Sequence, residues 1–223
     1  MSATPSLAEV RAFRAQHLER HVGPHYSGWL HFSTTTIGSL AAIAFAVSRV
    51  RSPSLGELAA IPIFFLIANF GEYFGHRGPM HHRARGALSI LFERHTQQHH
   101  HYYTHDVMAA DSPRDWQMVL FPPVMLVFFL GVVATPIGLL VGFLFGANLG
   151  WLFAATAISY FLTYEWLHWS YHQSETSFVG RLWFVRVLRR HHQLHHDLRR
   201  MTTANFNITF PIADRLFGTN AKN

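Results

Sequence analysis

Histidine is the residue whose number and spacing in this sequence most directly indicate chemistry. The chain has 223 residues, and 18 of them are histidines. No histidine run stands at either end, so a purification tag does not explain the count. Four motifs concentrate these residues: His76-Arg-Gly-Pro-Met-His81, His95-Thr-Gln-Gln-His99-His100, His168-Trp-Ser-Tyr-His172 and His192-Gln-Leu-His195-His196.

Helix geometry predicts which of these histidines point the same way. Residues four apart lie on one face of an α-helix, about 6 Å apart along its axis. His95 and His99 are therefore expected to project together, and so are His168 and His172. The three histidines of the last motif fall within roughly 100° of one another, so they can converge on one point or straddle two.

The first motif has a different spacing. His76 and His81 are five residues apart and enclose Gly78 and Pro79. Residues five apart do not share a face of a regular α-helix, and proline disrupts a helix interior. We therefore expect the helix to break within this motif, at the membrane boundary.

Clustered neutral imidazoles indicate a metal site for Fe, Zn, Cu or Ni. The motif histidines exceed the roughly four to six positions around one ion, so two metal ions are predicted. The predicted ligands are His76, His81, His95, His99, His100, His168, His172, His192, His195 and His196. The neighbours His82, His101, His105 and His191 stay open as ligands, and we interpret His17, His21, His25 and His31 as structural.

Each ligating histidine needs a partner for its second ring nitrogen. Three acids near the motifs are candidates to accept a hydrogen bond from that nitrogen, namely Glu72, Glu165 and Asp197. Glu165-x-x-His168 also matches once the Glu-x-x-His motif of soluble di-iron bundles. An alternative is therefore that Glu165 binds the metal directly instead of contacting a ligating histidine.

Composition indicates a membrane protein. Hydrophobic residues make up 49% of the chain and charged residues 13%, against roughly a quarter charged in soluble domains. Four apolar stretches, at about 29–50, 58–74, 116–134 and 137–164, approach the ~20 residues that cross a bilayer. Short connections containing Pro53 and Pro136 predict two helical hairpins. The absence of cysteine excludes disulfides, thiolate-ligated haem and cysteine-ligated iron–sulfur clusters.

The positions of the arginines predict the orientation in the membrane, and the spacing of the glycines predicts close helix packing. Arginines concentrate before the first stretch, in the 76–115 connection and after 165, which predicts both termini and the histidine motifs on the cytoplasmic side. Residues 178–190 are expected to form an interfacial amphipathic helix. Gly138, Gly142, Gly146 and Gly150 stand four apart, as expected for close helix packing in a membrane. No apolar signal core precedes residues 1–25, so we expect no cleaved targeting sequence.

At the four motifs the sequence resembles the fatty acid hydroxylase superfamily, which includes sterol desaturases and C4-methyl sterol oxidases. That family has H-x3-4-H, H-x2-3-HH, H-x3-H and H-x2-3-HH in order, and this chain has each in order. The tail from Asn205 to Thr219 also looks like the family's closing segment. The resemblance covers roughly residues 60–220. Through Tyr164-Glu-Trp-Leu-His168 and the last motif, the pattern is closer to fatty acid 2-hydroxylases.

The resemblance implies an all-α fold: four transmembrane helices as two hairpins, with a cytosolic histidine-rich helical cap. We expect one membrane domain over 1–223, with an amphipathic helix at 1–25 and a hydroxylase-like domain at 26–223. The resemblance also implies two iron ions, with zinc possible in the isolated protein, and O2-dependent hydroxylation of a lipid, expected to be a fatty acyl chain. No catalytic group beyond the metal ligands and no organic cofactor is predicted.

Breaking an inert C–H bond needs a redox-active metal, which zinc is not. The chain has no haem-binding His-Pro-Gly-Gly motif, so electrons are expected from a separate ferredoxin or cytochrome b5 with its reductase. Nucleic acid is not an expected partner, because the arginines flank apolar spans. The alternatives are a sterol desaturase or oxidase, a carotenoid hydroxylase, or a non-enzyme such as a membrane metal transporter or haem protein. The non-enzymes place ligands within spans, where this sequence has only His31.

Overall fold

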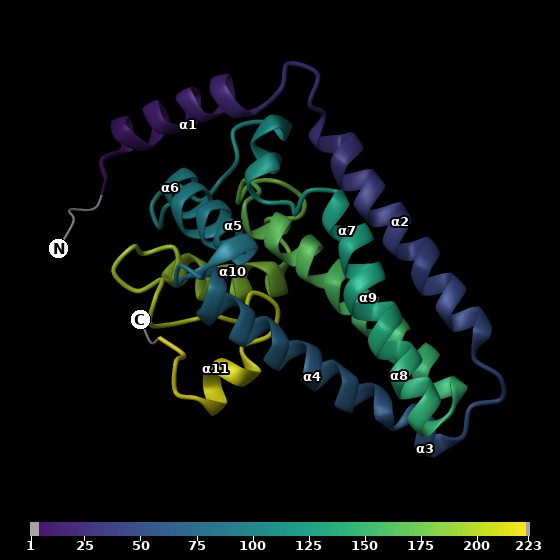
Figure 1. The fold of residues 1–223 in the computed structure, drawn as a ribbon. Helices are drawn as coiled ribbons and strands as arrows, with labels where there is room; N and C mark the ends of the chain where they lie inside the picture. The colour runs from purple at the N-terminus through teal and green to yellow at the C-terminus, as the bar shows by residue number, and fades with distance from the viewer. Residues whose placement is uncertain (1–4, 222–223) are drawn as a thin grey trace. The chain divides into compact units, whose positions relative to one another are not determined.

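The computed structural model describes residues 5–221, and every regular element within that range is a helix (Figure 1). The predicted all-α class is therefore confirmed for this part of the chain. The longer α-helices are α1 (Leu7–His21), α2 (Gly28–Arg49), α4 (Ala60–Gly75), α8 (Thr135–Phe145), α9 (Ala147–Tyr171) and α10 (Trp183–His195). Short α-helices are α3 (Leu55–Leu58), α5 (Ser89–Phe92), α6 (His100–Tyr102), α7 (Val124–Phe128) and α11 (Ile212–Leu216). The π-helices are η1 (His76–Met80), η3 (Glu93–His99) and η5 (Phe129–Ala134), and the 3₁₀-helices are η2 (Gly86–Leu88) and η4 (Pro113–Met118).

The chain divides into two compact units. The first, which we call the histidine unit, takes the described parts of Met1–Gly28, Asn69–Leu120 and Leu167–Asn223. The second, the apolar unit, consists of Trp29–Ala68 and Phe121–Trp166. All four histidine motifs belong to the histidine unit.

Within residues 5–221, three helical segments are long and apolar enough to cross a membrane: Gly28–Arg49, Leu55–Met80 and Val124–Phe145. Large apolar side chains on them face outward, and Phe143 is 86% exposed. An exposed apolar surface of this kind is typical of a membrane interaction. Four spans were expected; the fourth stretch, 137–164, divides between α8 and α9, and the 25-residue α9 is not among the three candidates.

The turn expected near Pro136 lies ten residues later in the chain. Helices α7, η5 and α8 form one continuous run from Val124 to Phe145, and it ends at Gly146, which has φ 110°. Pro136 stands in the first turn of α8, directly after the π-helical η5. A missing N–H is tolerated in a first turn, whereas a positive φ suits glycine. The predicted third span, starting at 116, was also placed too early, because η4 occupies residues 113–118.

The glycine spacing reflects close packing, but between two helices. Gly138 and Gly142 lie on α8, Gly150 lies on α9, and Gly146 forms the turn between them. A Cβ atom added at Gly150 would lie 2.5 Å from the Gly138 carbonyl oxygen and 2.9 Å from the Gly142 Cα. Only glycine permits this approach, which membrane helices use for packing.

Two helices that the sequence predicts as amphipathic belong to the histidine unit. The predicted N-terminal helix begins at Leu7 after a capping box, in which the Ser6 and Glu9 side chains each accept the other's backbone N–H. Helix α10 begins at Trp183, later than the expected 178, and continues to His195. Its exposed face carries Trp183 and Val187, as an interfacial helix would. The opposite face is buried and includes the last histidine motif.

Candidate metal centre

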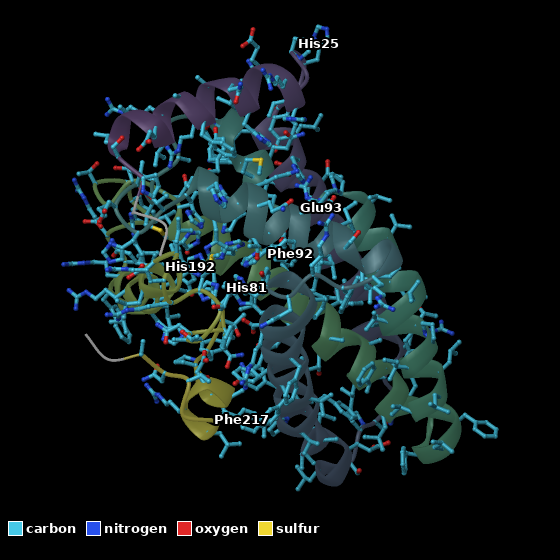
Figure 2. The ribbon with its side chains drawn as sticks, turned by 60° about the vertical axis from the view of Figure 1, so that its left-hand side comes forward. His25, His81, Phe92, Glu93, His192 and Phe217 are labelled. Atoms are coloured by element: carbon cyan, nitrogen blue, oxygen red, sulfur yellow. The ribbon has the colours of Figure 1, made fainter. Side chains whose placement is uncertain are left out.

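The ten predicted ligands gather in two groups of five, and every one of them is buried. Within each group, the candidate ligand nitrogens all lie within 4.8 Å of one another. The first group is His76, His81, His95, His100 and His195. The second group is His99, His168, His172, His192 and His196. Figure 2 labels one member of each, His81 and His192, both inside the histidine unit.

The first group is built on π-helices. His76 begins η1 and His81 follows its end, while His95 lies in η3 and His100 follows it. In a π-helix the hydrogen bonds run from residue i to i+5, so a residue five positions along lies one turn further on the same side. The regular α-helix does end at this motif, at Gly75, but the chain continues as the π-helix η1 to Met80 instead of breaking between the two histidines. A wider turn, which contains Pro79, brings both imidazoles to one group.

The second group uses ordinary helical spacing. His168 and His172 project together from α9, as predicted from their separation of four. His192 and His196 do the same at the end of α10. His195 turns to the first group, so the last motif straddles the two groups.

The second motif is also divided. The sequence predicts that His95 and His99 project together, and their rings do stack with centroids 5.2 Å apart. His95 nevertheless belongs to the first group and His99 to the second. The π-helical turn of η3 separates the directions of their ring nitrogens, which the α-helical expectation did not include.

The Nε2 atoms of neighbouring histidines face one another at short range. In the first group the pairs His76–His95 and His81–His195 have Nε2 separations of 2.7 and 2.9 Å. In the second group the pairs His192–His196 and His99–His168 have separations of 3.0 and 3.2 Å. Two nitrogens that each lie about 2.1 Å from one metal ion, at a right angle, are about 3.0 Å apart. The spacing therefore matches ligands around an ion.

The opposite ring nitrogens determine which tautomer is present. The Nδ1 atoms of five histidines contact backbone carbonyls: His76 with Phe206 at 2.5 Å, His99 with Met118 at 2.7 Å, His172 with Met108 at 2.8 Å, His195 with Ala204 at 2.8 Å and His196 with Tyr103 at 2.5 Å. A carbonyl oxygen only accepts, so each Nδ1 must donate and each Nε2 carries a lone pair. Facing lone pairs repel one another unless a cation binds them. The arrangement of these rings therefore fits a metal ion in each group.

Burial also favours the ligating form of the rings. It lowers the pKa of His99 to about 3 and holds the pKa of His195 and of His196 well below the usual range. These imidazoles are therefore neutral at pH 7. Neutral imidazole is the form that binds a metal.

A protein-family model matches the part of the chain that contains both histidine groups. The family model described as fatty acid hydroxylase matches residues 61–219, a range that includes all ten histidines. The chain belongs to the fatty acid hydroxylase family. Its fold is also similar to a solved structure of full-length Scs7p, in which only the hydroxylase domain is visible. The TM-score is 0.59 and the identity 20%, with 88% of this chain and 67% of that chain covered. No curated protein matches the chain significantly.

In this family member, the three acids predicted to contact ligating histidines have other partners. Glu72 accepts hydrogen bonds from the backbone N–H groups of Ile208 and Thr209 and from the Thr209 hydroxyl. Glu165 accepts the Phe121 N–H within the apolar unit. Asp197 forms ion pairs with Arg199 and Arg200. Among the described residues, both candidate ligand groups consist of histidine alone.

Backbone carbonyls take the place that the sequence assigned to acids. They come from segments 103–118 and 204–206, and the Thr96 hydroxyl adds a contact of 3.1 Å with His81 Nδ1. Sequence reasoning missed these partners because every residue has a carbonyl. One signal was present, namely the tail beginning at Asn205, which resembles the family's closing segment.

The remaining histidines lie outside both groups. Those next to the motifs have local partners: His82 contacts the Arg77 carbonyl, His101 the Thr96 carbonyl, His105 the Asp106 carboxylate and His191 the Asp214 carboxylate. His31 contacts the Phe121 carbonyl within the apolar unit. These contacts give each of the five a structural partner.

Proposed function

We propose that this family member is a membrane di-iron enzyme that uses O2 to hydroxylate a lipid, with a fatty acyl chain as substrate. The observation that carries the proposal is the pair of buried five-histidine groups in a chain of the fatty acid hydroxylase family. Three apolar helices able to span a membrane support a lipid substrate.

Each histidine group would hold one iron ion through its Nε2 atoms. Bound iron supplies the redox chemistry for O2 activation, which zinc does not have. The overall reaction balances as R–H + O2 + 2 electrons + 2 protons giving R–OH + H2O. Both electrons come from a separate donor of the ferredoxin or cytochrome b5 type.

The protein's own contribution is to orient and isolate the ligands. Carbonyl acceptors at Nδ1 fix five of the ten rings and direct their lone pairs inward, and such outer partners tune metal affinity and activity. Burial of all ten rings excludes water, which protects a reactive centre from side reactions. We place the termini and the histidine unit on the cytoplasmic side, where soluble electron donors are available.

The apolar unit offers a surface suited to an acyl chain. It contains a cavity of about 510 Å³, lined by apolar residues such as Phe45, Leu130, Leu139 and Trp151 and by the packed glycines. Ligand cavities of this size and character are common for apolar molecules. The cavity supports a lipid substrate rather than a water-soluble one.

Lipid mass spectrometry under ¹⁸O2 tests the proposal. Cells that express the wild-type chain should contain a lipid 18 mass units heavier than its precursor, because one oxygen atom comes from O2. The label should disappear without oxygen or with the His168→Ala variant, and it should persist with the control His105→Ala. A product that forms without O2, or that carries oxygen from water, would contradict the hydroxylase assignment. A product two mass units lighter would indicate desaturation instead.

A further inference from the structure

Arg14 is a buried charge outside the segment matched by the family model. It lies on α1, its side chain is 5% exposed, and the matched segment begins at residue 61. Burying a guanidinium is unfavourable unless its donors are satisfied. The position of Arg14 therefore needs an explanation in terms of what it binds.

The guanidinium of Arg14 binds a single loop at four points. Its Nε donates to the Tyr102 carbonyl at 2.8 Å, and Nη2 donates to the Val107 carbonyl at 2.8 Å. Its Nη1 donates to the Ala109 carbonyl and to the Asp111 carboxylate, both at 2.9 Å. A planar guanidinium with several fixed donors suits such a task, whereas the single nitrogen of lysine does not.

The same loop orients two ligands of the second histidine group. The Tyr103 carbonyl accepts from His196 Nδ1 at 2.5 Å, and the Met108 carbonyl accepts from His172 Nδ1 at 2.8 Å. The Ala110 N–H also donates to the His172 carbonyl at 2.8 Å. The carbonyls at 102, 107 and 109 thus bind Arg14, while those at 103 and 108 bind the histidines.

A ring contact joins the same residues. The Arg14 guanidinium carbon lies 4.9 Å from the centre of the Tyr103 ring, within cation–π range. The Tyr103 ring in turn lies 4.1 Å, centroid to centroid, from the His172 ring. Arg14 therefore contacts the second group's surroundings by two routes, through the loop backbone and through Tyr103.

We propose that Arg14 is a positioning residue for the second histidine group, acting through residues 102–111. In the part of the chain that the structure describes, the carbonyls that bind rings of the first group belong to Phe206 and Ala204, outside this loop. The inference rests on the proposed function only in requiring that each group bind a metal ion. It makes helix α1 a functional part of the metal centre.

The expected loss of metal affinity depends on how many contacts separate Arg14 from the ligating histidines. Changes to the direct partners of ligands typically cost 10–100-fold in metal affinity. Arg14 acts one hydrogen bond further away, so we expect the lower end, about 10-fold, in the second group alone.

Two double-alanine variants of the full chain, used as backgrounds, each leave one histidine group intact. His76→Ala together with His81→Ala leaves only the second group, and His168→Ala together with His172→Ala leaves only the first. Arg14→Lys, which keeps the charge but loses the fork, is added to each, and Zn²⁺ affinity is measured by chelator competition. Arg11→Lys, an exposed position on the same helix, is the matched control.

Arg14→Lys should weaken Zn²⁺ binding about 10-fold where only the second group remains and leave the first group's affinity unchanged. Equal effects in both backgrounds, or none in either, would overturn the inference. If Arg14→Lys does not fold, Arg14→Gln, which retains a planar two-hydrogen donor, is measured in its place. Failure of both to fold, with Arg11→Lys folded, would assign Arg14 to general stability and also overturn it. Parent backgrounds that bind no Zn²⁺ would instead contradict the two-metal proposal.

Discussion

The two histidine groups have the same composition but different construction. Each contains five buried histidines. In the first group, two pairs are spaced by five residues on π-helices, whereas in the second, two pairs are spaced by four on or at the end of α-helices. Similar sites can therefore be built from different backbone geometry.

The segments that orient the rings differ as well. Carbonyls of 204–206 serve the first group, and carbonyls of 103–118 serve the second. The first segment is held by Asp214, which accepts the N–H groups of Phe206 and Asn207 at 2.9 and 2.7 Å. The second is held by Arg14 and by Asp115, which accepts the Tyr102 hydroxyl and, at 2.5 Å, the Ser112 N–H. Metal binding by each group should therefore depend on the residues that hold its own carbonyl segment.

The largest expected effect comes from the ligands themselves. An alanine at any of the ten predicted positions should abolish measurable hydroxylation, because losing a direct ligand should cost at least the 10–100-fold typical of losing a ligand's hydrogen-bond partner. Elemental analysis should show the loss confined to the group that contains the altered residue. Metal loss spread evenly over both groups would mean that they form one interdependent centre.

The contrast between the groups also shows what the sequence can predict. The motifs identify ten histidines that the structure brings together, and a spacing of four correctly pairs His168 with His172. The partition between the groups does not follow from spacing, because η1 and η3 adopt π-helical turns that no residue type specifies. Carbonyl partners escape prediction because they are independent of side chains.

The fold differs from the prediction for the same reason: residue patterns locate the helices, but local hydrogen bonding decides where the chain turns. Apolar stretches locate the three helical segments able to cross a membrane, but Pro136 predicted a turn that Gly146 makes. Both residues favour a turn, and only the surrounding hydrogen bonds decide which one bends the chain. The sequence did not predict that Arg14 is buried against a loop, because an arginine on an arginine-rich helix is usually exposed.

Substituting either of the two supporting aspartates should have a smaller effect on metal binding, confined to a different group in each case. Asp214→Asn should weaken metal binding by the first group about 10-fold, and Asp115→Asn should do the same for the second, since each loosens a segment that orients ligand rings. Metal affinity in the two single-group backgrounds measures both. If both variants weaken the same group, the two supporting segments are not separate.

The smallest effects are expected at the histidines beside the motifs. Alanine at His82, His101, His105 or His191 should leave at least about a tenth of the activity, because these rings contact the protein outside both groups. Hydroxylation assays on matched neighbours give the sharpest comparison, with His191→Ala active and His192→Ala inactive. The reverse result would place His191 in the second group and require a different helix at α10.

The most direct test of two separate histidine sites is the metal content of purified protein. Wild-type protein should contain about two equivalents of Fe, or of Zn if zinc replaces iron during expression, since each group of neutral imidazoles suits one such ion. The variant that combines His76→Ala with His81→Ala should retain about one equivalent, and so should the variant that combines His168→Ala with His172→Ala. One equivalent or fewer in folded wild-type protein would contradict the account.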